Sequence, residues 1–213
     1  MNETRTRTGN LIVLSGPSGV GKSTLVGEVR KHLPELEFSI SCTTREPRPG
    51  ELDGREYYFL TPEEFEARSQ AGGFVEEARV FAHRYGTLKS EVLDRVRRGA
   101  DVILDIDVQG AAQIREAAKR DPELAAAAVF VLISPPSLEL LETRLRKRAT
   151  DSEEQLTLRI AAAERELARF RLYDFVIVND DLATAAGELE GLFRSFRLRT
   201  GLIPEGSVPW CRK

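Results

Sequence analysis

The sequence predicts an α/β protein in three layers, with helices on both faces of a parallel sheet. Three observations support this prediction. Apolar runs of strand length alternate with stretches of helical periodicity, a glycine-rich turn joins the first run to the first helix, and two segments interrupt the alternation. The chain has 213 residues, 41% of them hydrophobic and 31% charged. This length is enough for one elaborated domain with its own core.

The core elements follow in chain order. Residues 11–15 form the first expected strand, and the helix after it has apolar residues every four positions from Leu25 to Leu33, just before Pro34. Three later runs have the continuous apolar character of strands buried on both faces: 102–107, 129–134 and 175–179. Each is followed by residues of helical character, and the last helix is expected at about 182–199.

Residues 38–88 are the first interruption. They contain short strand-like pieces separated by turn formers such as Pro47, Gly50 and Gly54. We interpret this segment as an inserted subdomain of mixed α/β structure.

Residues 137–172 are the second interruption, and they contain two helical patterns. The second pattern begins with a capping-box spacing, Ser152 followed three residues later by Gln155. Its basic side chains would usually form a solvated face, but such a helical hairpin can also move as a lid. The tail at 200–213 has turn formers without periodicity, so we expect it to be loose. The predicted core therefore comprises 10–37, 89–136 and 173–199.

Composition excludes several classes of function. The net charge of −3 and the dispersed arginines provide no basic surface for nucleic acid. Cys42 and Cys211 belong to no metal-ligand spacing, and we expect Cys42 to be a small buried side chain. The segment MNETRTRTGN is not of signal-peptide type, and no apolar run approaches the ~20 residues of a membrane span. We expect a cytoplasmic protein with no membrane partner.

The glycine-rich turn matches the phosphate-binding pattern G-x-x-x-x-G-K-[ST], placed after a strand and before a helix as the mechanism requires. Glycines let backbone N–H groups approach an anion, and the following helix adds its positive end. Lys22 would reach the β- and γ-phosphates, and the Ser23 hydroxyl would bind Mg²⁺. The alternative is a plain glycine-rich connector with a surface lysine. The loop comprises Gly16, Pro17, Ser18, Gly19, Val20, Gly21, Lys22, Ser23 and Thr24.

Phosphate-binding loops serve ATPases, GTPases and kinases alike, so the acceptor must be found elsewhere. Five separated motifs occur: SCTTREPRPGE with Gly54-x-x-Tyr57 from 41, FVE from 74, YGT from 85, LDIDVQG from 104 and VNDD from 178. In order and spacing they resemble guanylate kinases, which transfer a phosphoryl group from ATP to GMP. The resemblance covers about residues 10–198. It implies a P-loop NTPase core, a GMP-binding subdomain and a helical lid.

The resemblance also implies residues for the GMP phosphate. This dianion needs permanently charged planar donors, which Arg45 and Arg48 supply. Tyr57 and Tyr85 match family positions that add phenolic hydrogen bonds. Taken without the resemblance, the arginines could lie in an exposed turn and the tyrosines could be ordinary strand aromatics.

Guanine presents N1–H and N2–H₂ donors beside the O6 acceptor, so a selective pocket needs carboxylates and hydroxyls. The family's carboxylates match Glu76 and Asp107, and its hydroxyls match Ser41 and Thr87. A buried carboxylate left without those donors carries a desolvation penalty, which disfavours AMP. Considered alone, Glu76 would more often be a surface strand residue.

For the ATP side, the resemblance implies that the loop binds ATP with Mg²⁺. Asp105 and Asp107 are two apart on the expected strand, so both should point to one face, with Asp105 orienting the waters of Mg²⁺. Asn179 would lie near the adenine or cap the following helix. The lid arginines that would close on the transition state are Arg144, Arg148 and Arg159.

The implied mechanism is alignment and charge neutralisation by Lys22, Arg45 and the lid arginines, because the phosphate oxygen of GMP needs no general base. Two alternatives remain at this stage: a non-catalytic guanylate kinase-like binding module, and a related kinase with another acceptor such as a ribosyl phosphate. The sequence leaves the oligomeric state open.

Overall fold

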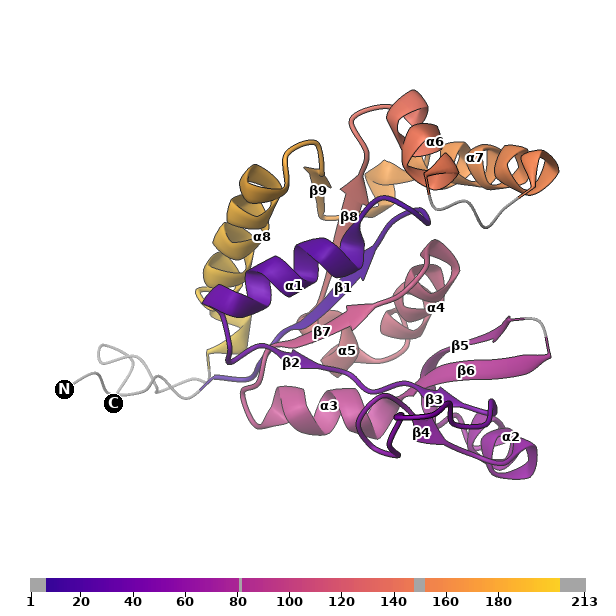
Figure 1. The fold of residues 1–213 in the computed structure, drawn as a ribbon. Coiled ribbons are helices and arrows are strands. Elements are labelled where there is room, and N and C mark those ends of the chain that lie inside the picture. Colours follow the sequence, from indigo (N-terminus) through magenta and orange to yellow (C-terminus); the bar gives the residue numbers. More distant parts are fainter. Residues whose placement is uncertain (1–6, 81, 148–151, 204–213) are drawn as a thin grey trace.

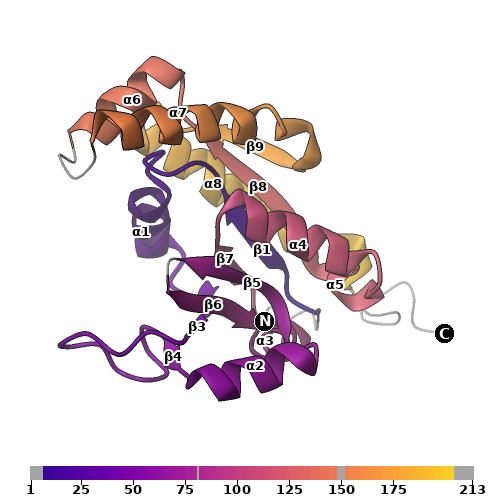
Figure 2. The ribbon, with the colours of Figure 1, turned by 90° about the vertical axis from the view of Figure 1, so that its right-hand side faces the viewer.

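The computed structural model describes residues 7–80, 82–147 and 152–203 (Figures 1 and 2). Its larger sheet has five parallel strands in the order β2-β7-β1-β8-β9. In that order the strands are Glu37–Phe38, Val102–Asp105, Leu11–Ser15, Ala128–Ser134 and Phe175–Val178. All five residues of the central strand β1 are buried. Such continuous burial is expected of a parallel strand covered on both faces.

Helices cover both faces of this sheet, and the side chains of β1 contact helices on each face. Its side chains alternate, so Ile12 and Leu14 pack against α1 and α8, whereas Leu11 and Val13 pack against α3, α4 and α5. The first pair of helices spans Lys22–His32 and Leu182–Phe196, and the second group spans Lys89–Arg97, Val108–Ala118 and Pro122–Ala127. The predicted three-layer α/β fold is therefore confirmed.

A second sheet of four strands, in the order β4-β3-β6-β5, is built from residues inside the first interruption. In that order the strands are Tyr58–Phe59, Cys42–Thr43, His83–Leu88 and Phe74–Val80. The pair β3–β4 is parallel, whereas β3–β6 and β5–β6 are antiparallel. Helix α2, Pro62–Gln70, packs on this sheet through the fully buried Phe65, whose ring stacks on Phe74 with centroids 4.4 Å apart.

Helices α6, Leu138–Arg146, and α7, Glu153–Leu167, form a hairpin near the end of the core where β1 gives way to α1 (Figure 1). The predicted capping box is present: Ser152 Oγ accepts from the Gln155 N–H at 3.3 Å, and Gln155 Oε1 accepts from the Ser152 N–H at 3.1 Å. The apolar contacts between the two helices centre on Leu141, Leu145 and Leu156. Shortly after α7 the chain forms the 3₁₀ helix η1, Phe170–Leu172.

Several element boundaries differ from the sequence expectation. Strand β7 ends at Asp105, β9 ends at Val178 and α8 ends at Phe196. Residues 200–202 form a second 3₁₀ helix, η2, and Leu202 is buried, so the expectation of a loose tail is wrong for this part. Residues 204–213 lie outside the described part of the chain. No helix among the described residues is long and apolar enough to span a membrane.

Asp101 joins three distant parts of the chain at the start of β7. Its carboxylate accepts from Arg7 Nη2 at 2.6 Å, from Asn10 Nδ2 at 2.7 Å and from Arg197 Nε at 2.9 Å. Nearby, the Thr8 N–H donates to the Leu202 carbonyl at 3.0 Å. Burial acts to raise the pKa of Asp101, but the hydrogen bonds from Arg7 and Asn10 outweigh it and lower that pKa.

Candidate active site

The phosphate loop connects β1 to α1, and three of its glycines have positive φ: Gly16 at 151°, Gly19 at 87° and Gly21 at 96°. Space restricts these positions as well. A Cβ on Gly16 would lie 2.3 Å from the Ile133 carbonyl oxygen, and one on Gly19 would lie 2.6 Å from a methyl carbon of Leu145. Glycine is therefore required here by both the backbone conformation and the close approach of β8 and α6.

Helix α1 begins directly at this loop, with Gly21 as its N-cap and no side-chain cap. Its first backbone N–H groups are therefore available to an anion, and they carry the positive end of the helix dipole. Lys22 Nζ donates to the Gly16 carbonyl at 2.8 Å and lies 3.9 Å from Asp105 Oδ1. Burial raises the pKa of Asp105, and the ammonium of Lys22 partly offsets this rise.

Asn179 and Arg144, which are distant from the loop in sequence, both bind the Val20 carbonyl in it. The Val20 carbonyl accepts from Asn179 Nδ2 at 2.8 Å and from Arg144 Nη1 at 3.4 Å, and Arg144 Nη2 donates to the Asn179 carbonyl at 3.0 Å. The N-cap of α8 is Asp181, which accepts from the Thr184 N–H. The helix-capping alternative for Asn179 is therefore wrong.

The other two proposed lid arginines are Arg148 and Arg159. Arg159 lies on α7 and is exposed. Arg148 falls outside the described residues.

Two residues after β3, in the bend that leaves the second sheet, Arg45 lies among aromatic rings. Its guanidinium carbon lies 5.4 Å from the ring centre of Tyr57, and the rings of Tyr57 and Tyr85 meet edge to face at 6.0 Å. Arg45 Nη2 also forms an ion pair with Glu51 Oε1 at 3.0 Å, and Glu51 Oε2 accepts from the Arg48 N–H at 2.8 Å. This bond from the Arg48 backbone and the one from Arg45 lower the pKa of Glu51. The structure thus brings three of the four predicted phosphate ligands together, while Arg48 is exposed beside them.

Glu76 on β5 is a buried carboxylate. Only 7% of the residue is exposed, and Oε1 accepts from the Thr87 hydroxyl at 2.7 Å. Burial raises the pKa of Glu76, the bond from Thr87 opposes this, and the charge of Asp107 adds to it. A Cβ on Gly110 of α4 would lie 3.2 Å from Glu76 Oε2. Ser41 is half-buried just before β3.

The two aspartates after Leu104 do not share one strand face, so that part of the sequence interpretation is wrong. Because β7 ends at Asp105, Asp107 lies beyond the strand and is the N-cap of α4, where its Oδ1 accepts from the Gly110 N–H at 2.8 Å. Asp105 lies near Lys22 and Asp107 lies near Glu76. The pair is thus divided between the phosphate loop and the buried carboxylate.

Comparison with known proteins identifies the family. Residues 8–196 match the family described as "Guanylate kinase". A guanylate kinase of Carboxydothermus hydrogenoformans is 47% identical over 191 residues, 90% of each chain, and one of Desulfotalea psychrophila is 44% identical over 198 residues, 93% of this chain and 95% of the relative. The chain belongs to the guanylate kinase family. The crystal structure of a guanylate kinase from Anaplasma phagocytophilum, 31% identical, superposes with a TM-score of 0.69 and covers 92% of this chain and 90% of the other.

Guanylate kinases are ATP:GMP phosphotransferases, and this is the activity of the chain. The resemblance seen in the sequence motifs is therefore confirmed, and the comparisons give no support to a non-catalytic binding module. The motif analysis did not assign a role to Glu51, although it lies inside the first guanylate kinase motif. The sequence does contain one indication of this contact. Glu51 lies three residues after Arg48, and a glutamate at this spacing can reach back to the earlier backbone N–H, as in a capping box.

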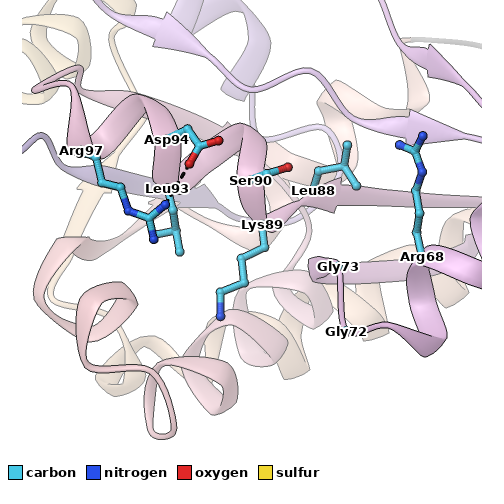
Figure 3. A pocket seen from close by; sticks show the side chains of 9 residues that line it. All are labelled: Arg68, Gly72, Gly73, Leu88, Lys89, Ser90, Leu93, Asp94 and Arg97. Atoms are coloured by element: carbon cyan, nitrogen blue, oxygen red, sulfur yellow. Dashed lines mark hydrogen bonds and ion pairs between the residues drawn. The ribbon is translucent and has the colours of Figure 1, made fainter.

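A cavity of about 480 Å³ lies away from these groups, between the end of α2 and the start of α3 (Figure 3). Its lining includes Arg68, Lys89 and Arg97. Two of these cations are paired: Lys89 with Asp121, and Arg97 with Asp94 at 2.8 Å. None of the candidate guanylate kinase residues lines it, so we do not place the nucleotide sites there.

Proposed function

We propose that the donor ATP binds at the phosphate loop, that GMP binds on the second sheet, and that the residues named above act on these two substrates. The γ-phosphoryl group then passes to the GMP phosphate without a general base, because the attacking oxygen is already ionised. Catalysis consists of alignment and of neutralising charge on the transferring group. Lys22 and the first N–H groups of α1 hold the donor phosphates.

The buried carboxylate of Glu76 carries the acceptor assignment. A carboxylate this buried needs hydrogen-bond donors, and Thr87 supplies one of them. Guanine N1–H and N2–H₂ would supply the others, whereas adenine offers no donor at N1. Asp107 and Ser41 complete the proposed base pocket.

The GMP phosphate is assigned to the cluster of Arg45, Tyr57 and Tyr85, with Arg48 beside it. The guanidinium of Arg45 is flanked by aromatic rings, which fix its plane, and a planar fork matches two phosphate oxygens. Its present partner Glu51 is a carboxylate that a phosphate dianion would replace.

The helical hairpin supplies the remaining charge. Arg144 already bonds the Val20 carbonyl in the phosphate loop, so α6 is tied to the donor site. We assign Arg144, Arg148 and Arg159 to the transferring phosphoryl group. In this proposal residues 38–88 bind GMP and residues 137–172 form the lid. Closure of the lid over the core would exclude water that otherwise hydrolyses ATP.

Mg²⁺ fits the donor site as a partner of ATP. The described residues contain no group of three or more His, Cys, Asp or Glu side chains able to hold a metal by themselves, so the nucleotide phosphates must supply most ligands. Ser23 in the first turn of α1 and Asp105 beside Lys22 offer the oxygen donors that Mg²⁺ prefers. When bound, the ion neutralises charge on the β- and γ-phosphates.

The test is ADP formation from Mg-ATP with GMP, AMP, CMP and UMP offered separately. Turnover with GMP and not with the other three is the expected result. Efficient turnover with AMP would contradict the assignment of Glu76 to the base.

A further inference from the structure

Gln113 on α4 makes an unusual contact with β5. Its Nε2 donates to the Glu77 carbonyl at 2.7 Å, and its Oε1 accepts from the Glu77 N–H at 2.9 Å. The side-chain amide therefore pairs with both backbone groups of one residue, as a neighbouring strand would. Since β5 is an edge strand of its sheet, no other strand in the described part of the chain occupies this side of it (Figure 2).

The contact lies next to the proposed base pocket. Glu77 follows Glu76 directly, and the strand register of β5 against β6 shifts between Phe74 and Glu76. Such an irregularity weakens the ladder that would otherwise fix the strand. One turn before Gln113 on the same helix, Gly110 gives Glu76 room, because a Cβ there would lie 3.2 Å from Glu76 Oε2.

We infer that Gln113 is a positioning residue for guanine recognition, holding the backbone of β5 so that Glu76 stays at a fixed place relative to Asp107 on α4. The inference rests on the proposed role of Glu76. Two bonds to the same residue fix both the position of the strand along the helix and its rotation. One alone would leave the rotation free, and successive side chains on a strand point to opposite faces.

The role predicts a selective defect. Gln113→Ala, and Gln113→Met, which keeps the length of the side chain but loses the amide, should each raise KM for GMP by about three- to tenfold, the range expected for one or two hydrogen bonds. KM for ATP and kcat should change by less than about twofold, because the phosphate loop does not contact this pair. The ratio of GMP to AMP use should fall.

Gln70→Ala is the matched control. Gln70 is also an exposed helical glutamine, and among the described residues its side-chain amide donates only to Glu66 of α2, at 2.8 Å. KM values of this variant should stay at the wild-type level, and thermal unfolding of all the variants should show similar midpoints. Equal rises of both KM values together with a lowered midpoint would make Gln113 merely structural and overturn the inference.

Glu76→Gln separates this inference from the proposed function. If Glu76→Gln raises KM for GMP but the Gln113 variants do not, the inference is wrong and the base pocket stands. If neither substitution changes KM for GMP, both are wrong. In the double variant Gln113→Ala should add less than it does alone, since both act through one carboxylate; a full additive effect would place Gln113 elsewhere in the mechanism.

Discussion

The two proposed substrate sites of this kinase are built in different ways. The proposed donor site is made mainly of backbone: three glycines with positive φ, the open N-terminus of α1, and a Val20 carbonyl that accepts hydrogen bonds from Asn179 and Arg144. The proposed acceptor site is made of side chains on β5 and β6 and on the loops beside them, and its main cation, Arg45, is paired with a carboxylate.

The difference shows where each site obtains its selectivity. A backbone cradle recognises phosphate, which every nucleotide has, and it is preformed by local geometry. In our proposal the carboxylate of Glu76 and the hydroxyl of Thr87 recognise a particular base, and their positions depend on contacts such as the Thr87–Glu76 bond and the Gln113–Glu77 pair. Substitutions in one site should therefore leave the KM for the other substrate unchanged.

Lys22→Ala should have the largest effect. Removing the cation that we propose neutralises the transferring phosphoryl group should lower kcat by at least about 100-fold, the scale found for a preorganised charge at a reacting centre. Steady-state ADP formation measures this. Lys31→Ala serves as the control, because it removes an exposed lysine of the same helix whose ion pair is with the neighbouring Glu28. A wild-type kcat in Lys22→Ala would remove the loop lysine from the mechanism.

Glu76→Gln should raise KM for GMP by about 10- to 100-fold, because a hydrogen bond to a charged acceptor is worth more than one to a neutral amide. KM for ATP should stay within about twofold. Titration with each nucleotide alone, followed by calorimetry, checks the two affinities. Equal losses for both nucleotides would contradict the assignment of guanine to this carboxylate.

Asn179→Ala should have the opposite selectivity and a smaller effect, raising KM for ATP and not KM for GMP. It deprives the Val20 carbonyl of its 2.8 Å partner, so the phosphate loop loosens and KM for ATP should rise by about three- to tenfold. KM for GMP should not change. A rise confined to GMP would show that Asn179 acts on the acceptor site.

The change in GMP affinity with pH should be smaller near neutrality than the effects of the three substitutions above. Because burial raises the pKa of Glu76 above its usual 4.5, the carboxylate gains its proton at a higher pH than an exposed glutamate. Guanine needs the ionised form, so affinity should fall as the pH is lowered through this raised pKa. The ratio of GMP affinities between the wild type and Glu76→Gln cancels titration of the GMP phosphate. A constant ratio would contradict the prediction.

Much of this architecture was predictable from sequence, where it depends on local chemistry. Strand β1, the phosphate loop and the Ser152 capping box follow from apolar runs, glycines and fixed spacings, and each is found where the pattern places it. The separation of Asp105 from Asp107 was not predictable from strand periodicity. It depends on where β7 stops, and tertiary contacts decide that point.

Contacts between distant segments were also not predictable from the sequence. Asn179 bonds a carbonyl 159 positions away in the chain, and no local pattern distinguishes that amide from a helix cap. Gln113 lies on an exposed helix face, where glutamine is ordinary, and its partner is a backbone group without a sequence signature. Only packing of α4 beside β5 reveals it.

The hydrogen bond between Thr8 and Leu202 has a consequence for engineering. It joins the segment before β1 to η2, at the end of the sheet opposite the phosphate loop. With the residues outside them removed, a short linker between Thr8 and Leu202 should close the remaining chain into a ring without disturbing the strand order. Opening the ring at another surface turn would give a circular permutant, and fusion partners attached near Thr8 or Leu202 would leave the nucleotide sites unobstructed.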